Sequence, residues 1–217
     1  MVAHFPITLP EADLDKLVTD CESLPVQGLI VYVNDFQECH ASRDELALYA
    51  NIIQSLARTD KPVLCLFGGY FTATLLKAGL RAFSNGVGYG EYRDSGYHTG
   101  GQAWRRYYFP CLHRFLPDGA AQTVLDNLQG DSNLWCTTAG VQAHLDAGTT
   151  LLELANETLL HHFMNCRSRE LSGVRAESTE ALIAHLEETH AAFSEKPLIP
   201  RDTYDHLLRW SAALRTL

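Results

Sequence analysis

Carboxylate side chains follow two of the short apolar segments that the sequence predicts to be buried strands. Asp35 comes directly after residues 28–34, and Glu91 and Asp94 follow residues 86–90. Parallel strands end at one edge of their sheet, so we expect these three carboxylates to lie at a common catalytic site. A carboxylate there can act as a nucleophile or as a general acid or base. The alternative for Glu91 and Asp94 is a structural salt bridge to a nearby arginine.

A glycine pair, Gly68-Gly69, lies between a second apolar segment, residues 63–67, and a helical pattern that begins near Thr72. Glycines let a ligand approach the backbone, and the N–H groups of a helix N-terminus attract anions. We therefore predict that this pair binds substrate. The segment contains neither a P-loop nor a GxGxxG pattern, and a strand-to-helix turn that requires positive φ is the alternative.

Arginines and aromatic residues alternate in a segment that follows these carboxylates. We expect Arg105, Arg106 and Arg114 to contact the backbone phosphates of a nucleic acid. Trp104 or Tyr108 is expected to stack on an extruded base. The alternative is a solvated arginine face beside aromatic residues of the core.

Histidines and cysteines are scattered along the chain. His162 and Cys166 have the i, i+4 spacing of two metal ligands on one helix, but structural zinc needs four ligands together. We therefore predict no metal and no other cofactor, with zinc as the alternative. The six cysteines include no CxxC pair, which favours reduced thiols and a cytoplasmic location.

Helical and strand-like patterns alternate from residue 8 to residue 91. Thr8-x-x-Glu11 and Ser42-x-x-Glu45 are capping boxes, and each opens a segment with apolar residues at helical spacing. Strands joined through helices are expected to be parallel. Three short apolar segments have the composition of buried strands, namely residues 28–34, 63–67 and 86–90.

The second half of the chain has a different pattern. Residues 92–117 are rich in glycine, aromatic residues and arginine, show no period and predict a long loop. Helical patterns follow at residues 118–128, 139–146, 150–170, 178–193 and 202–215. We therefore divide the chain into residues 1–117, which hold the strands and the long loop, and a helical region, residues 118–217.

The predicted fold class is α/β, as a partial (β/α) barrel or a small parallel sheet followed by a mostly α-helical C-terminal region. Three strands are too few to close a barrel, which needs eight. We favour the partial barrel, because strands of another chain would cover its open edges. A partner chain, or a homo-oligomer of this chain, is expected to complete it.

Composition limits the partners of the protein. The chain has 217 residues and a formal net charge of −9, so it repels nucleic acid as a whole. Contact with nucleic acid would therefore depend on the local basic patch of arginines described above. No segment approaches 18 consecutive apolar residues, and the N-terminus lacks a signal-peptide pattern, so we expect no membrane association.

The segment from Lys61 to Glu91 resembles the late barrel of the queuine-type tRNA-guanine transglycosylases and their DNA-modifying 7-deazaguanine relatives. In that family a strand that begins with Lys-Pro ends in a glycine pair. A helix then leads to a Gly-Val strand that ends in the nucleophilic aspartate. Here the matching residues are Lys61-Pro62, Gly68-Gly69 and Gly86-Val87, with Glu91 in the place of the nucleophile.

The resemblance extends over residues 28–170 and includes a trace of the family's zinc site. Cys136 and His162 have the spacing of two of its ligands. Asp131 and Asn133 stand where the other two cysteines would be, which leaves too few soft ligands for zinc.

The resemblance implies a transglycosylase-like protein that recognises or exchanges a guanine-type base in nucleic acid. Glu91 would attack the glycosidic carbon, and Asp35 or Asp94 would act as the acid or base. Two other functions fit the sequence. One is a non-catalytic binding or assembly subunit derived from the same fold, and the other is a small α/β enzyme that acts on a phosphorylated metabolite at the Gly68–Thr72 turn.

Overall fold

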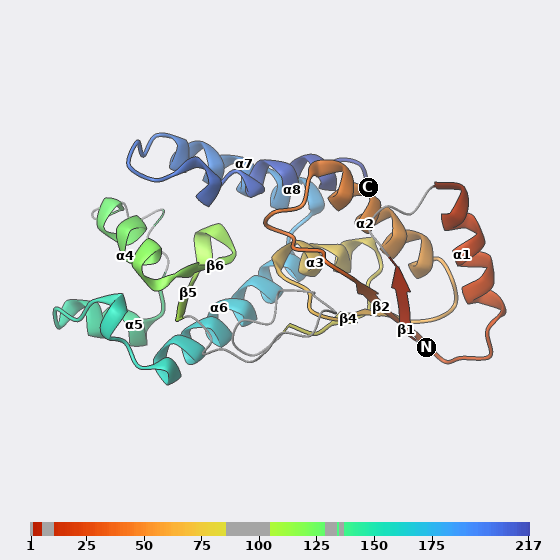
Figure 1. Cartoon of the computed structure of the whole chain (residues 1–217), viewed down its shortest axis with the longest axis horizontal. Helices are drawn as coiled ribbons and strands as arrows, with labels where there is room; N and C mark the ends of the chain where they lie inside the picture. The colour runs from red at the N-terminus through yellow and green to blue at the C-terminus, as the bar shows by residue number, and fades with distance from the viewer. Residues whose placement is uncertain (1, 6–10, 86–104, 129–133, 135–136) are drawn as a thin grey trace.

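The structure of the chain is a computed structural model, and it describes residues 2–5, 11–85, 105–128, 134 and 137–217. Strands and helices alternate in the first half (Figure 1). Their order is β1 (Val2–Phe5), α1 (Glu11–Ser23), β2 (Leu29–Val33), α2 (Arg43–Ala57), β3 (Val63–Cys65), α3 (Tyr70–Thr74), the 3-10 turn η1 (Leu75–Ala78) and β4 (Ala82–Phe83).

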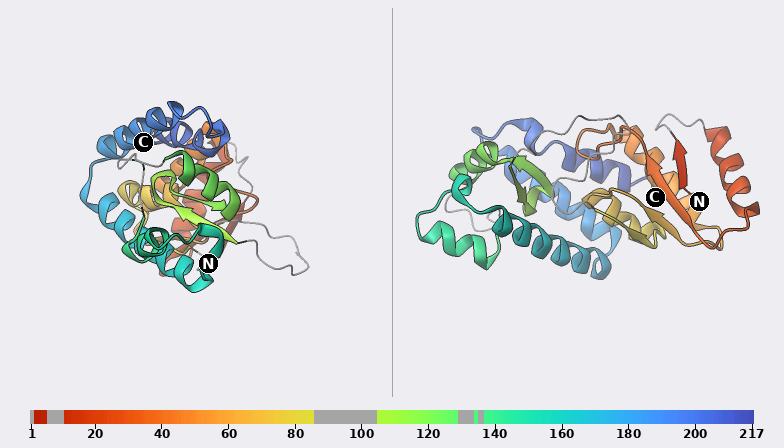
Figure 2. Two further views of the ribbon diagram at one scale, coloured as in Figure 1. Left: turned by 90° about the vertical axis from the view of Figure 1, so that its left-hand side faces the viewer. Right: turned by 60° about the horizontal axis from the view of Figure 1, so that its bottom comes forward.

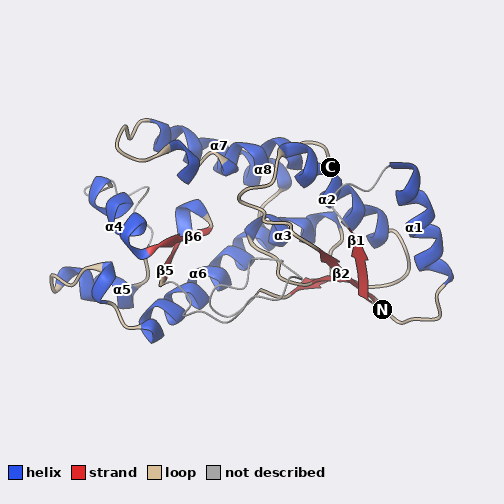
Figure 3. Ribbon diagram, viewed as in Figure 1, coloured by secondary structure: helices blue, strands red, loops and turns tan. Residues whose placement is uncertain are grey.

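The four strands form one parallel sheet in the order β1-β2-β3-β4. Figure 3 draws the strands in red. The predicted small parallel sheet is therefore confirmed. Its strand order follows the chain, as in a (β/α) barrel, but the sheet is open, and no barrel closes within the described part of the chain. The sequence pattern does not predict β1 or β4, and the predicted strand at residues 86–90 lies outside the described residues.

The residues of β2 show how the sheet is covered. Leu29, Val31 and Val33 are buried, whereas Ile30 and Tyr32 are half-buried. Alternate side chains of a strand point to opposite faces, so one face of the sheet packs on the helices and the other is only partly covered by described residues. The helix on the buried side is chiefly α2, which contacts β3 and η1.

The capping box predicted at the start of α2 is present. The Glu45 backbone N–H donates to the Ser42 hydroxyl over 3.2 Å, and the Ser42 N–H donates to the Glu45 carboxylate over 2.7 Å. These two bonds satisfy N–H groups that have no partner inside the helix. They also fix the point at which the loop after β2 ends.

The second half begins with a β-hairpin and continues with helices, as predicted for the helical region. The elements are β5 (Arg106–Phe109), the 3-10 turn η2 (Pro110–Leu112), β6 (Arg114–Pro117), α4 (Asp118–Asn127), α5 (Ala139–Asp146), the 3-10 turn η3 (Leu151–Glu153), α6 (Asn156–Ala176), α7 (Thr179–Ser194), the 3-10 turn η4 (Arg201–Thr203) and α8 (His206–Leu214). The prediction of a loop over residues 92–117 is wrong for residues 106–117. Tyr107, Tyr108 and Phe109 are all buried, so β5 lacks the two-residue alternation that would have identified it.

The molecule is elongated, with the parallel sheet near one end and the hairpin, α4 and α5 at the other (Figures 1 and 2). Two helical segments connect the ends. One is α6, which contacts β5, α3 and η1, and the other is the α7–α8 pair, in which α8 packs on α2. One hydrophobic core accordingly contains buried residues from both halves, among them Leu46, Tyr107 and Trp210. None of the described helices is long and apolar enough to cross a membrane.

Candidate functional site

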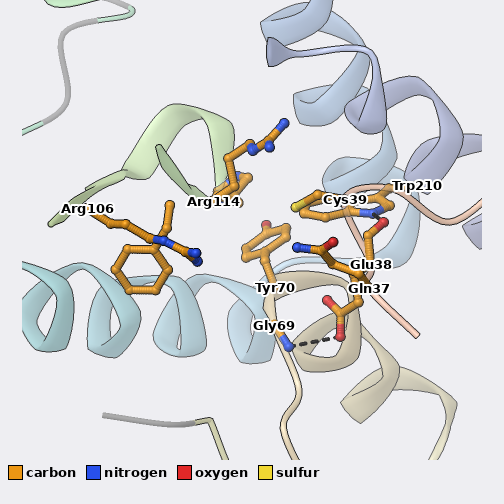
Figure 4. A pocket seen from close by; sticks show the side chains of 10 residues that line it. Gln37, Glu38, Cys39, Gly69, Tyr70, Arg106, Arg114 and Trp210 are labelled. Atoms are coloured by element: carbon orange, nitrogen blue, oxygen red, sulfur yellow. Dashed lines mark hydrogen bonds between the residues drawn. The ribbon is translucent and has the colours of Figure 1, made fainter. Parts of the chain in front are cut away.

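A small pocket lies where the carboxyl ends of β2 and β3 meet the β5–β6 hairpin and α8. Its accessible volume is about 40 Å³, which is room for a few water molecules or for one small polar group of a ligand. The sheet loops and α8 supply Gln37, Glu38, Cys39, Gly69, Tyr70 and Trp210, and the hairpin supplies Arg106, His113, Arg114 and Phe115. Figure 4 shows Tyr70 at the centre, with Arg106 and Arg114 on one side and Gln37 and Glu38 on the other.

Glu38 holds the two sheet loops together on one side of this pocket. Its side chain is buried, and its carboxylate accepts hydrogen bonds from the Gly69 N–H over 2.8 Å and the Thr72 N–H over 3.3 Å. The Thr72 hydroxyl donates a further short hydrogen bond to the same carboxylate. Glu38 therefore occupies the position at the start of α3 where an external anion would bind. This arrangement does not favour a phosphate site at the Gly68–Thr72 turn.

The glycine pair is explained by the same packing. A Cβ atom on Gly69 would lie 2.6 Å from Glu38 Oε2, and one on Gly68 would lie 2.5 Å from Thr72 Cγ2. Real Cβ atoms do not approach other atoms so closely, so both positions need glycine for contacts within the chain. Gly69 lines the pocket, but its N–H already donates to Glu38.

The second buried carboxylate, Glu170 of α6, collects donors from three side chains. Tyr108 donates its hydroxyl proton over 2.7 Å, His113 Nδ1 lies 2.7 Å from Oε1, and Arg167 donates over 3.1 Å. Burial raises the pKa of Glu170, but the hydrogen bond from His113 and the charges of His113 and Arg167 outweigh burial, and the net shift of the pKa is downward. Glu170 is therefore an ionised carboxylate at neutral pH.

His113 is held in one orientation on the pocket wall. Its ring stacks on that of Tyr70, with the ring centroids 3.5 Å apart and the planes 8° from parallel. Because an ionised carboxylate can only accept hydrogen bonds, Nδ1 of His113 must carry a proton. The other nitrogen, Nε2, is buried and has no hydrogen-bond partner among the described residues. His113 lines the pocket, and an imidazole whose Nδ1 is held by a carboxylate is oriented as in a general acid or base.

The backbone at His113 is unusual as well. Its φ of 52° lies in the left-handed region, which non-glycine residues adopt rarely and often at functional sites. This conformation ends the η2 turn and directs the chain into β6. It therefore helps to place the imidazole over Tyr70.

The three predicted phosphate-binding arginines lie in different surroundings. Arg106 and Arg114 line the pocket, and Arg114 also donates to the Asp202 carbonyl over 3.1 Å. Arg105 faces elsewhere, because its guanidinium donates to the carbonyls of Leu152 and Leu154. Arg106 and Arg114 thus lie at one site. Arg105 instead links the start of the hairpin to η3 by hydrogen bonds.

Tyr108 does not line the pocket. It is buried between the rings of Phe115 and Phe163, whose centroids both lie 5.0 Å from its own, and its hydroxyl donates to Glu170. A ring enclosed in this way has no face on which an extruded base can stack, so the role predicted for Tyr108 is not supported.

The predicted catalytic carboxylates are not assembled by the described residues. Glu91 and Asp94, together with Trp104, lie outside them. Asp35 does follow β2, but it is exposed, has a φ of 52° and accepts a hydrogen bond from the Asn34 side chain over 2.6 Å. It is absent from the pocket lining, so its role as acid or base stays a prediction.

His162 belongs to the core rather than to a metal site. Nδ1 lies 3.0 Å from the Thr138 hydroxyl and Nε2 lies 2.9 Å from the Tyr108 carbonyl. Burial lowers the pKa of His162 to about 4, so the ring is neutral at neutral pH. Across the described residues, no group of three or more histidine, cysteine, aspartate or glutamate side chains is arranged to hold a metal ion.

Sequence reasoning did not pair His113 with Glu170. They are 57 positions apart in the chain, and no local pattern joins them. Glu38 follows the first predicted strand as Asp35 does, so it can be expected at the common edge of the sheet for the same reason as Asp35. Nothing in the sequence indicated that Glu38 would cap α3.

None of the protein-family models, curated proteins or solved structures compared with this chain matches it. Function is therefore inferred from the geometry of the pocket.

Proposed function

We propose that this chain is an enzyme that binds the anionic group of a small molecule in the pocket between the sheet and the hairpin and moves a proton with His113. The observation that carries the proposal is the state of His113. Its Nδ1 lies 2.7 Å from the buried Glu170 carboxylate, and its Nε2 is buried without a partner among the described residues. A buried polar atom without a partner costs free energy, so its presence in a residue that lines the pocket favours a ligand that completes its hydrogen bonding.

The charges around the pocket favour an anion. Arg106 and Arg114 bring two guanidinium groups to the wall, and guanidinium groups recognise carboxylates and phosphates. Glu38 also lines the pocket, and its carboxylate accepts hydrogen bonds from Gly69 and Thr72. The anion is therefore expected on the hairpin side of the pocket, where Arg106 and Arg114 lie.

Tyr70 adds a neutral donor to the same wall. Burial, with the negative charges of Glu170 and Glu177, raises the pKa of Tyr70 far above its usual value. The phenol accordingly keeps its proton at neutral pH. A protonated phenol beside an imidazole can stabilise an oxygen atom that becomes negative during a reaction.

The binding half of this proposal is tested with inorganic phosphate as the probe, by isothermal titration calorimetry on the full chain. Loss of one charge-assisted hydrogen bond should weaken binding by about tenfold or more in Arg106→Gln. The matched control is Arg169→Gln, an exposed arginine of α6, which should bind as the wild type does. Absence of phosphate binding by the wild type, or equal affinity in Arg106→Gln, would contradict the proposal.

A second candidate is the exchange of a guanine-type base, with Glu91 as nucleophile and Asp35 or Asp94 as acid or base. The observation that favours it is the strand order, because consecutive parallel strands joined through helices are the repeating unit of a (β/α) barrel. A partner chain or a second copy would supply further strands along β1 or β4, the edges of the sheet in its described part. This candidate predicts incorporation of labelled guanine or 7-deazaguanine into tRNA or DNA and its loss in Glu91→Gln. No incorporation by the complex purified from its host would rule it out.

A further inference from the structure

A second and larger pocket adjoins the small pocket, where the start of α2 meets η4 and α8. Its volume is about 500 Å³, against about 40 Å³ for the small pocket. Cys39 and Arg114 line both pockets, and Figure 4 shows them next to each other above Tyr70. A ligand whose anionic group occupies the small pocket can therefore extend past these two side chains into the larger one, which we call the outer pocket.

The wall of the outer pocket is polar throughout its described part. Two guanidinium groups, an imidazole, a hydroxyl, a thiol and three carboxylates line it. Pockets for small organic ligands are usually lined by apolar and aromatic side chains with only a few polar groups. Here the guanidinium groups supply hydrogen-bond donors and the carboxylates supply acceptors. A ligand that fits this wall must both donate and accept hydrogen bonds along its length, as hydroxyl groups do.

The two guanidinium groups of the outer pocket are held in position by backbone carbonyls. Arg209 donates to the Cys39 carbonyl over 2.7 Å and to the Ala41 carbonyl over 3.0 Å. Arg114 donates through Nη1 to the Asp202 carbonyl over 3.1 Å and, among the described residues, makes no hydrogen bond through Nε or Nη2. Because Arg114 lies at the junction of the two pockets, its remaining donors favour a ligand that accepts hydrogen bonds there.

The three carboxylates of the outer pocket differ in the partners that they have. Asp205 accepts a hydrogen bond from Arg201 over 2.9 Å, and Glu45 accepts one from the Ser42 N–H over 2.7 Å. Asp202 is exposed, and its side chain has no hydrogen-bond partner in the described part of the chain. The Asp202 carboxylate is therefore the acceptor of this pocket that a hydroxyl group of a ligand can use.

We propose that the substrate is a polyhydroxylated anion, a sugar phosphate or a sugar acid, with its anionic group in the small pocket and its hydroxyl groups in the outer pocket; this inference rests on the proposed function. Arg114 contacts the ligand where the anionic group joins the sugar. The Asp202 carboxylate accepts hydrogen bonds from the hydroxyl groups, and the Arg209 guanidinium donates to them. An alkyl chain of the same length would exclude water from these charged groups without replacing its hydrogen bonds, so the site should discriminate against it.

The test is isothermal titration calorimetry on the full chain with matched pairs of ligands. Glucose-6-phosphate is compared with hexyl phosphate, ribose-5-phosphate with pentyl phosphate, and glucuronate with hexanoate. The members of each pair share the anionic group and have similar lengths, and they differ in their hydroxyl groups. We expect at least one sugar anion to bind the wild type about tenfold or more tightly than its alkyl partner does.

A substitution assigns this preference to the outer pocket. Asp202→Ala removes the available acceptor from an exposed position and should reduce the preference to about threefold or less. The matched control is Glu188→Ala, which removes an exposed carboxylate of α7 and should keep the wild-type preference. The ratio of the two affinities in each pair is compared, because a general effect of the lost charge on anion binding cancels in it.

The outcomes separate this inference from the proposed function. Equal affinities within every pair overturn the inference, and so does a preference that Asp202→Ala retains in full. Inorganic phosphate is titrated into the same wild-type sample. Phosphate binding without any preference for the sugar anions removes the outer pocket from the substrate site and keeps the anion site, whereas absence of binding by phosphate and by all six organic anions removes the proposed function as well.

Discussion

Glu170 is the residue on which the local structure of the pocket most depends. It receives the Tyr108 hydroxyl, His113 Nδ1 and the Arg167 guanidinium inside the protein, with its own side chain only 8% exposed. Removing one member of a buried charged network leaves the other members without their partner, which costs far more than an exposed ion pair contributes. Glu170 should therefore act on stability as well as on the orientation of His113.

The substitution Glu170→Gln is expected to lower the free energy of unfolding at pH 7 by about 3 kcal/mol. Because the pKa of Glu170 is lowered from 4.5 in the folded state, its charge stabilises the protein fully above pH 4.5, and this contribution is lost as the pH falls through the folded-state pKa. The gap between wild type and variant should thus be constant above about pH 5 and narrow below it. Urea unfolding between pH 3.5 and pH 7 measures it, with Glu188→Gln, an exposed residue of α7, as control. A gap that does not change with pH would contradict the role given to the charge.

For His162 the folded state favours the neutral form of the side chain, whereas for Glu170 it favours the charged form. Burial lowers its pKa from 6.5 to about 4, so the unfolded chain binds a proton more readily than the folded one between these values. Wild-type stability should therefore fall as the pH drops from 6.5 to 4, by up to about 3 kcal/mol from this residue. His162→Gln should lack this part of the decline, whereas His161→Gln, at the exposed neighbouring position, should keep it. The measurement is the free energy of unfolding at several pH values between 6.5 and 4. If it falls equally with pH in wild type and His162→Gln, the ring of His162 is not buried and neutral.

At the scale of elements, α3 is held at its start by a side chain from another loop. Glu38 supplies the acceptor for the Gly69 and Thr72 N–H groups, and the N-cap residue Gly69 has no side chain to do so. This single carboxylate ties the loop after β2 to the loop after β3. The hydrogen bonds of Glu38 hold the loop after β2 against the loop after β3, and residues of both loops line the pocket.

Gly69→Ala tests this junction. The added Cβ would lie 2.6 Å from Glu38 Oε2, so the cap must break or the loops must separate, at a cost of about 2 kcal/mol in unfolding free energy. Gly140→Ala is the matched control, because nothing lies within 4 Å of a Cβ there and alanine in a helix should stabilise by about 0.5–1 kcal/mol. Thermal unfolding of the two variants gives the comparison. Equal effects of the two substitutions would mean that the Glu38 cap is not formed.

The elements that local sequence defines were predictable, and those defined by distant contacts were not. Ser42 and Glu45 form the expected capping box, because both of its hydrogen bonds span three residues. The β5–β6 hairpin was not predicted, because its first strand does not alternate between buried and exposed side chains. The side chain of Tyr108, which would face solvent in a strand with one buried face, is covered by α6. The pairing of His113 with Glu170 depends on the docking of α6 against the hairpin, which no local pattern encodes.

At the scale of the whole molecule, the helical region contacts the sheet domain through α8, next to the pocket. Trp210 and Arg209 of α8 donate to the carbonyls of Glu38 and Cys39, and α8 packs on α2. The buried core accordingly includes residues on both sides of the boundary predicted between residues 117 and 118. Segments that share a core are expected to unfold together.

Calorimetry should therefore show one cooperative transition for the full chain, with equal calorimetric and van't Hoff enthalpies. Trp210→Phe removes the hydrogen bond to the Glu38 carbonyl and keeps a large aromatic ring in the core. It should lower the midpoint without splitting the transition. Two resolved transitions in the wild type would show that residues 1–117 and 118–217 behave as separate units.

The protonation state of His113 tests the proposed site most directly. Long-range ¹H–¹⁵N NMR spectra, assigned with His113→Gln, report which ring nitrogen carries the proton when the ring is neutral. We predict a proton on Nδ1, held by Glu170, and a shift of the Nε2 resonance when inorganic phosphate is added. A proton on Nε2 with Nδ1 bare, or resonances that do not respond to phosphate, would contradict the dyad and the anion site built on it.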